Sequence, residues 1–93
     1  MAQQVVKKDG TREPFDAERI KKAVESAAGR TGLAPERVSE LAAQVSDVVL
    51  QFAADKEEVA SSELREKALA ELDRVEPSVA ESWRKYDEEQ GRI

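Results

Sequence analysis

Three basic side chains near the start of the chain, Lys7, Lys8 and Arg19, have the types and spacing that bind a compact anion. A planar guanidinium can hold a phosphate through two parallel hydrogen bonds, and an ammonium group adds a point charge. On a strand, consecutive residues point to opposite faces, so Lys7 and Lys8 reach one ligand together only if the segment curls over it. Gly10 allows the tight turn that such a lid needs. The stretch therefore predicts an anion-binding lid next to a helical arginine.

Two carboxylates in the same stretch, Glu13 and Asp16, indicate that the ligand also carries hydrogen-bond donors. They would repel phosphate, but a carboxylate accepts hydrogen bonds from amino and hydroxyl groups. The residues also have ordinary structural explanations. A Lys-Lys-Asp-Gly tip is typical of a solvated turn, and an aspartate before a helix is a common N-cap. Each residue alone is therefore ambiguous, and the hypothesis depends on their joint spacing.

Composition narrows the chemistry to binding. The chain has 93 residues without cysteine or histidine, which excludes zinc ribbons, thiolate nucleophiles, imidazole bases and disulfide frameworks. The length allows one domain rather than two. The net charge of −5 is uneven, because residues 1–30 carry seven basic and five acidic side chains and residues 31–93 carry eight and fifteen. This pattern favours a compact anion over a long polyanion, and direct nucleic-acid binding is not expected.

The sequence also bears on catalysis and location. It contains no Gly-x-x-x-x-Gly-Lys-Ser/Thr loop and no evident cluster of carboxylates for magnesium, so we expect a binding protein and not an enzyme. Residues 1–15 have no apolar run of signal-peptide length. No segment approaches the roughly 20 apolar residues of a membrane span. We therefore expect a cytoplasmic protein.

A two-stranded hairpin is predicted over about residues 4–15. Gln4 begins a short β-prone run, the Asp9-Gly10 pair would supply the positive φ angles of a type I′ turn, and Arg12 begins the returning strand. Pro14 has no N–H to donate and is expected at a strand end. Because an isolated hairpin is marginal in water, its apolar side chains are expected to pack on helices.

From Asp16 onward the apolar period changes to 3.6 and predicts four helices, over about residues 16–30, 35–54, 62–73 and 78–89. Expected starting residues are Asp16, Pro35, Ser61 or Ser62, and Ser78 with Glu81 as a capping box. Residues 55–58 are interpreted as a solvated connector. The predicted fold class is mainly α (α+β), with an N-terminal hairpin packed on a four-helix bundle, as a single domain over residues 1–93.

The fourth predicted helix has an apolar face formed by Val79, Trp83 and Tyr86. Aromatic residues at this spacing more often contact the core or a partner than stack on a ligand. The acidic run over residues 87–89 is expected to face solvent, because its negative charges would repel a nearby phosphate.

The first 20 residues together resemble the ATP-cone, a small regulatory nucleotide-binding domain found in many ribonucleotide reductases and in a bacterial repressor of their genes. The family pattern Val-x-Lys-Arg-x-Gly, Glu-x-Phe-Asp and Lys-Ile corresponds to Val5-x-Lys7-Lys8-x-Gly10, Glu13-Pro14-Phe15-Asp16 and Arg19-Ile20. Lysine stands for the usual arginine at position 8, and arginine for lysine at position 19, so charge is kept while hydrogen-bond geometry changes. The fourth helix has no clear match to the family pattern.

The resemblance implies ATP or dATP as the ligand, with Mg²⁺ accompanying it through the phosphates. The residues implied as nucleotide contacts are Val5, Lys7, Lys8, Gly10, Glu13, Asp16, Arg19, Ile20 and Ser61. Glu13 and Asp16 suit the adenine amino group or a ribose hydroxyl, and Val5 and Ile20 suit the face of the base. Ser61 is similar to a hydroxyl position that approaches the ligand in the family.

Two functions remain open from the sequence. The resemblance implies an allosteric module in which nucleotide occupancy controls oligomerisation or a partner such as a ribonucleotide reductase. The surface around Trp83 and Tyr86 is the candidate contact. The alternative is a degenerate cone that acts as a helical protein-interaction domain without nucleotide, which the acidic helices and the unmatched fourth helix allow.

Overall fold

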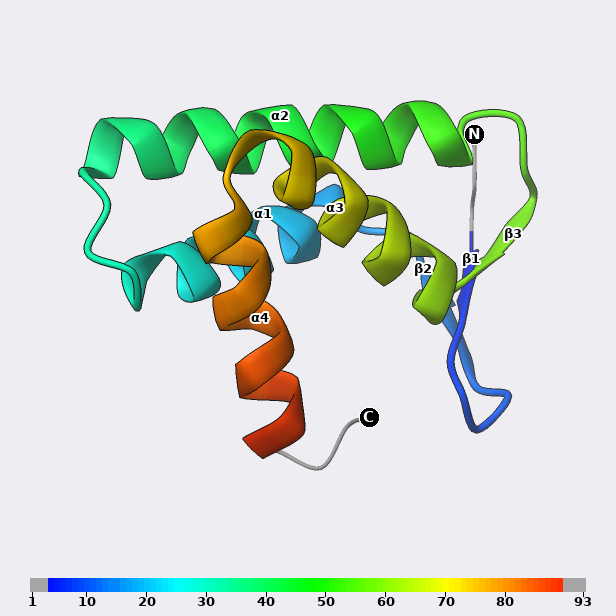
Figure 1. Cartoon of the computed structure of the whole chain (residues 1–93). Helices are drawn as coiled ribbons and strands as arrows, with labels where there is room; N and C mark the ends of the chain where they lie inside the picture. The colour runs from blue at the N-terminus through cyan, green and yellow to red at the C-terminus, as the bar shows by residue number, and fades with distance from the viewer. Residues whose placement is uncertain (1–3, 90–93) are drawn as a thin grey trace.

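A computed structural model describes residues 4–89 and shows four helices with a small sheet at one end of the molecule (Figure 1). In chain order the elements are β1 (Gln4–Val6), β2 (Arg12–Pro14), α1 (Ala17–Gly29), α2 (Pro35–Ala53), β3 (Glu58–Ala60), α3 (Ser61–Val75) and α4 (Pro77–Glu89). The prediction of a mainly α fold with an N-terminal hairpin is confirmed. Within residues 4–89, no helix combines the length and the apolarity needed to cross a membrane.

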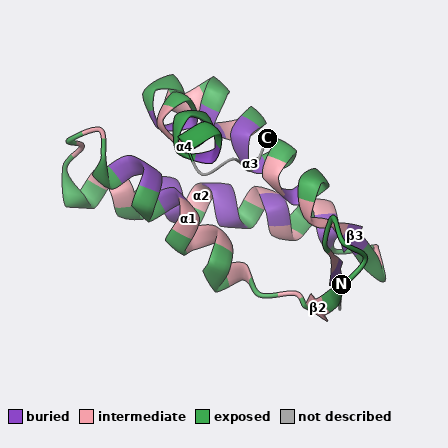
Figure 2. Cartoon of the chain, turned by 90° about the horizontal axis from the view of Figure 1, so that it is seen from below, coloured by how far each residue is buried: buried purple, intermediate pink, exposed green. Residues whose placement is uncertain are grey.

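The hydrophobic core lies between the four helices described here, because each contributes an apolar stripe to it (Figure 2). α2 packs against α1 and α3, and α4 also packs against both of these helices. Leu41, Val45 and Val49 of α2 are fully buried, as are Leu72 of α3 and Val79 of α4. Full burial of such a side chain stabilises the folded state by about 1.5–3 kcal/mol. These contacts form the scaffold that carries the sheet.

The first two helices start as predicted. Asp16 caps α1, and its Oδ1 accepts the N–H of Glu18 at 3.0 Å. Pro35 is the first residue of α2, where its missing N–H costs no helical hydrogen bond. Gly32, with a φ of 80°, makes the turn between the two helices.

The starts of the other two helices differ from the prediction. α3 begins at Ser61 with Ala60 in the N-cap position, so neither Ser61 nor Ser62 is the cap. The N–H of Ala60 instead donates to Oε1 of Glu63 at 3.1 Å. α4 begins at Pro77, so Ser78 lies inside the first turn and the predicted capping box is wrong. Proline is favoured at a first helical position because its φ is already helical, and it therefore fixes the start one residue earlier.

The hairpin turn is not of the predicted type I′. That turn needs a positive φ at both central residues, whereas Asp9 has none and Gly10 has a φ of 87°. The N–H of Gly10 donates to the carbonyl of Lys7 at 2.9 Å, and the N–H of Lys7 donates to the carbonyl of Thr11 at 2.8 Å. Hydrogen bonds from the side chain and backbone of Thr11 lower the pKa of Asp9. The loop is therefore longer than a two-residue turn, and Asp9 orders it through its carboxylate.

A third strand begins where the sequence predicted a solvated connector. β3 pairs in parallel with β1, so the sheet order is β2-β1-β3. Val59 pairs with Val5 and is 2% exposed. Arg12 of β2 forms an ion pair with Glu58 of β3 at 2.6 Å. β3 has one buried apolar side chain, which is too few to produce a visible period-2 pattern in the sequence.

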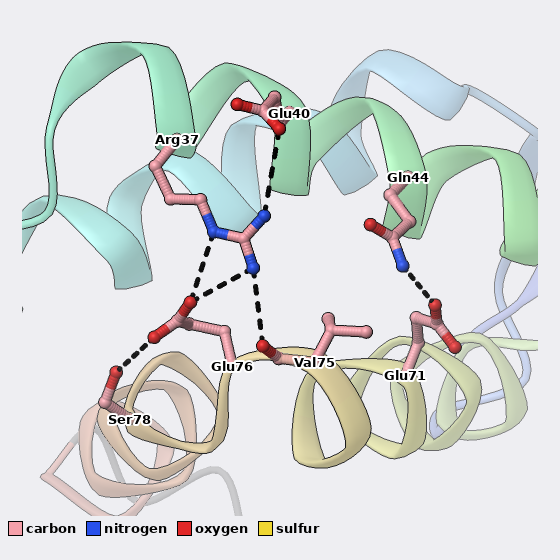
Figure 3. Close-up of polar contacts among 7 residues, drawn as sticks. All are labelled: Arg37, Glu40, Gln44, Glu71, Val75, Glu76 and Ser78. Atoms are coloured by element: carbon pink, nitrogen blue, oxygen red, sulfur yellow. Dashed lines mark hydrogen bonds and ion pairs between the residues drawn. The ribbon is translucent and has the colours of Figure 1, made fainter.

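A polar cluster fixes the corner between α3 and α4 to α2 (Figure 3). Arg37 donates from Nε and Nη2 to Oε1 of Glu76, both at 3.2 Å, and from Nη2 to the carbonyl of Val75 at 3.4 Å. Further along α2, Gln44 donates to Oε2 of Glu71 at 2.6 Å. We call these five residues the corner cluster. Because the last carbonyls of a helix lack intrahelical partners, Arg37 completes the end of α3.

Candidate functional site

A cleft of about 1060 Å³ lies between the hairpin and helices α1, α3 and α4. Eight of the nine predicted contact residues line it: Val5, Lys7, Lys8, Glu13, Asp16, Arg19, Ile20 and Ser61. The ninth, Gly10, shapes the hairpin turn and is not among the lining residues. The volume lies just above the usual range of small-molecule sites, about 300–1,000 Å³. Contact with a ligand stays a prediction for all nine residues.

The parallel pairing of β1 with β3 explains why Ser61 lies at the hairpin. Parallel strands run in the same direction, and the register pairs Val6 with Ala60. The next residues, Lys7 and Ser61, therefore leave the same edge of the sheet, although they are 54 positions apart in the chain. From the sequence, Ser61 could be placed near the ligand only by resemblance, because β3 was not recognised.

Strand alternation determines which hairpin side chains face the cleft. Val5 and Glu13 are paired in register and share one face of the sheet, and Lys7, two residues after Val5, follows on the same face. Lys8 lies beyond the end of β1, in the turn, and also lines the cleft. The two lysines reach one cleft because the chain bends at the turn. Consecutive side chains point to opposite faces only within a continuous strand, and Lys8 lies outside β1.

Glu13 forms ion pairs with two of the basic side chains. Its Oε2 lies 3.4 Å from Nζ of Lys7, and its Oε1 accepts a hydrogen bond from Nη1 of Arg19. The side chain of Glu13 is 26% exposed, compared with 46% for Lys7 and 64% for Arg19. Exposed pairs contribute about 0–1 kcal/mol each to stability. A multivalent anion can therefore replace Glu13 at modest energetic cost.

The apolar residues predicted to face a base have different exposures. Val5 is 8% exposed and belongs to the hydrophobic core, while Ile20 is half-buried and packs against that core. Asp16 lines the cleft while its carboxylate caps α1. The capping and ligand interpretations of Asp16 are therefore compatible, since a carboxylate has acceptor capacity beyond one N–H.

The far wall of the cleft contains an ion pair that the sequence analysis missed. Arg65 of α3 donates from Nε to Oδ2 of Asp87 on α4 at 2.6 Å, and both residues line the cleft together with Trp83. Asp87 is 4% exposed, so the prediction that it faces solvent is wrong. Its pairing with Arg65 allows this burial. Helical spacing is the sequence signal that could have found this pair. Arg65 lies one turn after Ser61 on α3, and Asp87 lies one turn after Trp83 on α4, so each shares a helix face with a residue that lines the cleft.

The two aromatic residues of α4 lie in different environments. Trp83 packs against the core and lines both the cleft and a smaller cavity of about 350 Å³ that α1 and α4 line. Tyr86 is 38% exposed, and the guanidinium of Arg30 lies 5.0 Å from its ring centroid. The apolar face of α4 is therefore fully buried at Val79 and becomes exposed toward Tyr86.

Comparison with known proteins defines the class to which this fold and cleft belong. The family model described as the ATP cone domain matches residues 3–92, and the chain belongs to this family of nucleotide-binding regulatory domains. The resemblance noted in the first 20 residues is thereby confirmed.

The chain is also similar to part of a protein named as a transcriptional repressor. The chain is 36% identical over 74 residues to the transcriptional repressor NrdR of Chloroflexus aggregans (strain MD-66 / DSM 9485). The match covers 76% of this chain and 41% of that relative. The chain thus spans less than half the length of the relative that it matches.

Proposed function

We propose that the chain is an allosteric regulatory module that binds ATP or dATP in the cleft. The observation that carries this proposal is the gathering of Lys7, Lys8 and Arg19 with Glu13 and Asp16 around one cleft. The cations suit the phosphates, and the carboxylates suit the amino and hydroxyl groups of an adenine nucleoside. Membership of the ATP cone family supports the same class of ligand.

The triphosphate is proposed to lie at the edge of the sheet where β1 and β3 end. Lys7 and Lys8 line the cleft together with Ser61, the first residue of α3. A helix N-terminus carries partial positive charge and favours anions. The base would then pack near Val5 and Ile20, which line the same cleft.

Mg²⁺ is proposed to enter with the nucleotide. Among residues 4–89, no group of three or more Asp, Glu, His or Cys side chains is placed to hold a metal ion. Mg²⁺ commonly binds through substrate phosphates and retained water molecules, which requires few protein ligands. The nucleotide phosphates are therefore the proposed ligands of the ion.

Titration calorimetry with ATP, dATP and GTP tests the proposal. We expect the adenine nucleotides to bind at sub-millimolar concentrations and GTP to bind more weakly. Guanine presents a carbonyl oxygen where adenine presents its amino group, and a carboxylate such as Glu13 cannot donate to that oxygen. If neither adenine nucleotide binds, the proposed function is wrong.

Control of assembly is proposed to act through α4. This helix contributes Trp83 and Asp87 to the cleft and carries the exposed Tyr86 on its outer part. A ligand shifts an equilibrium only when it binds two states unequally, and α4 is the element that touches both the ligand site and an exposed aromatic surface. The partner is a second copy or a protein of the ribonucleotide reductase type. Light scattering with and without dATP tests self-association, and an unchanged mass would remove that part of the proposal.

A helical interaction domain that binds no nucleotide is the alternative, and one observation favours it. Lys7 and Arg19 already pair with Glu13, and Arg65 pairs with Asp87, so these charges are compensated within the chain itself. The calorimetric titration separates the two functions, because the alternative predicts no binding heat with any nucleotide.

The absence of direct nucleic-acid binding stays a separate prediction. The relative is named a transcriptional repressor, but the match covers 41% of it. Residues 31–93 of this chain carry eight basic and fifteen acidic side chains, which disfavours contact with a long polyanion. We propose that this chain alone does not bind duplex DNA, and a gel-shift titration at low salt tests this.

A further inference from the structure

Glu13 lies where an anionic ligand of the cleft would contact the chain. Its two carboxylate oxygens engage Lys7, the residue that follows β1, and Arg19, in the first turn of α1. Its pairing with Val5 places it on the face of the sheet that lines the cleft. Two cations from separate elements are therefore held by one anion that belongs to the protein.

We propose that Glu13 determines specificity in this cleft, as an internal anion that a ligand must displace before phosphate binds Lys7 and Arg19. The inference rests on the proposed nucleotide site and adds the means by which that site distinguishes among polyphosphates. A bare polyphosphate breaks both ion pairs and leaves the Glu13 carboxylate close to phosphate charge. Both effects weaken its binding, because like charges repel and a lost partner is not replaced.

An adenine nucleotide restores a partner to Glu13. The exocyclic amino group of adenine donates hydrogen bonds, and a carboxylate accepts them. Displacement from the two cations is then offset by a new contact to the base. Glu13 thus links base recognition to phosphate binding, so that the cations become available to a ligand that carries both groups.

Binding of ATP and of inorganic tripolyphosphate to Glu13→Gln and to the unmodified chain tests this inference. Glutamine has nearly the same size and can still accept a hydrogen bond, so the substitution removes the negative charge and little else. Glu18→Gln is the matched control. Glu18 is also near the start of α1, but it pairs with Lys21 at 3.6 Å and is not among the cleft residues. Thermal unfolding of both variants verifies that the fold is kept.

We expect Glu13→Gln to raise the affinity for tripolyphosphate by about three- to tenfold, the scale on which exposed ion pairs act. The affinity for ATP should rise less, so that the preference for ATP over tripolyphosphate falls. Glu18→Gln should leave that preference unchanged. An unchanged tripolyphosphate affinity in Glu13→Gln, or an equal gain for ATP, would overturn the inference but not the proposed function. Failure of the unmodified chain to bind ATP would overturn both.

Discussion

The corner cluster and the cleft both join charged side chains from separate elements, but they distribute charge in opposite ways. At the corner, one cation, Arg37, contacts the carboxylate of Glu76 and the carbonyl of Val75. In the cleft, one carboxylate, Glu13, contacts two cations, one of which is Arg19. The side chain of Arg37 is 36% exposed, whereas that of Arg19 is 64% exposed. The corner therefore fixes helices to one another, whereas Glu13 holds its two cations through exposed ion pairs that a stronger anion can replace.

Substitutions of the cleft cations should have the largest effect, and that effect should be on ligand binding. Lys7→Ala and Arg19→Ala should each reduce ATP affinity by about tenfold or more, because each removes a charge-assisted hydrogen bond worth roughly 1.5–3 kcal/mol. Their unfolding free energies should change by less than about 1 kcal/mol, because the ion pairs that they break are exposed. Calorimetry and thermal unfolding measure the two quantities.

Lys21→Ala is the matched control for both cleft variants. Lys21 lies on α1, pairs with Glu18 and is not among the residues that line the cleft. Its replacement should leave ATP affinity unchanged. If Lys7→Ala and Arg19→Ala bind ATP as tightly as this control, the site has been misplaced.

Asp87 should behave as an intermediate case, because it is buried like a structural group and also lines the cleft. Asp87→Asn replaces a charged partner of Arg65 with a neutral one and should lower the unfolding free energy by about 1–3 kcal/mol. ATP affinity should not fall, since the change removes negative charge from the cleft wall. Urea denaturation and calorimetry give the two values. Equal stability of Asp87→Asn and the exposed neighbour variant Glu88→Gln would contradict the structural role.

Arg37→Ala should lower the unfolding free energy and leave ATP affinity unchanged, which is the reverse of what we expect for the cleft variants. We expect a loss of about 1–2 kcal/mol in unfolding free energy, because Glu76 and the end of α3 lose a donor. ATP affinity should be unchanged. Arg37→Lys should restore part of the stability, since it keeps the charge without the bidentate geometry. A fall in ATP affinity comparable to that of Arg19→Ala would contradict the division between corner and cleft.

The smallest expected effect is a pH dependence at the corner. Hydrogen bonds from Arg74, and then from Gln44, lower the pKa of Glu71 from its usual 4.5. A carboxyl group whose pKa is lower in the folded state stabilises the protein above the unfolded-state pKa, and this contribution is lost as the pH falls. Unfolding free energy should therefore decrease from about pH 5 to pH 3, and less steeply in Glu71→Gln. Urea denaturation across this range checks the slope, and the exposed control Glu25→Gln should leave it unchanged.

The sequence contained enough information for the helices and for most of the cleft. A 3.6-residue apolar period marks each helix, and the spacing from Val5 to Ile20 identified residues that share one cleft in the structure. It did not reveal β3, because the single buried residue Val59 makes no pattern and its partner strand is remote in the chain. It also misplaced Asp87, because burial of a carboxylate depends on a partner from another helix. The missed features are those that arise between elements and not within one.

The pairing of β1 with β3 has a consequence for the order in which the protein folds. Val5 and Val59 are 54 positions apart, and α1 and α2 lie between them. Closing so long a segment costs chain entropy, whereas the helices form from local contacts on a faster timescale. We therefore expect the sheet edge with Lys7 and Ser61 to assemble after α1 and α2 have docked. A ligand held at that edge binds only chains that have completed this closure, so its binding energy is added to the stability of the finished fold.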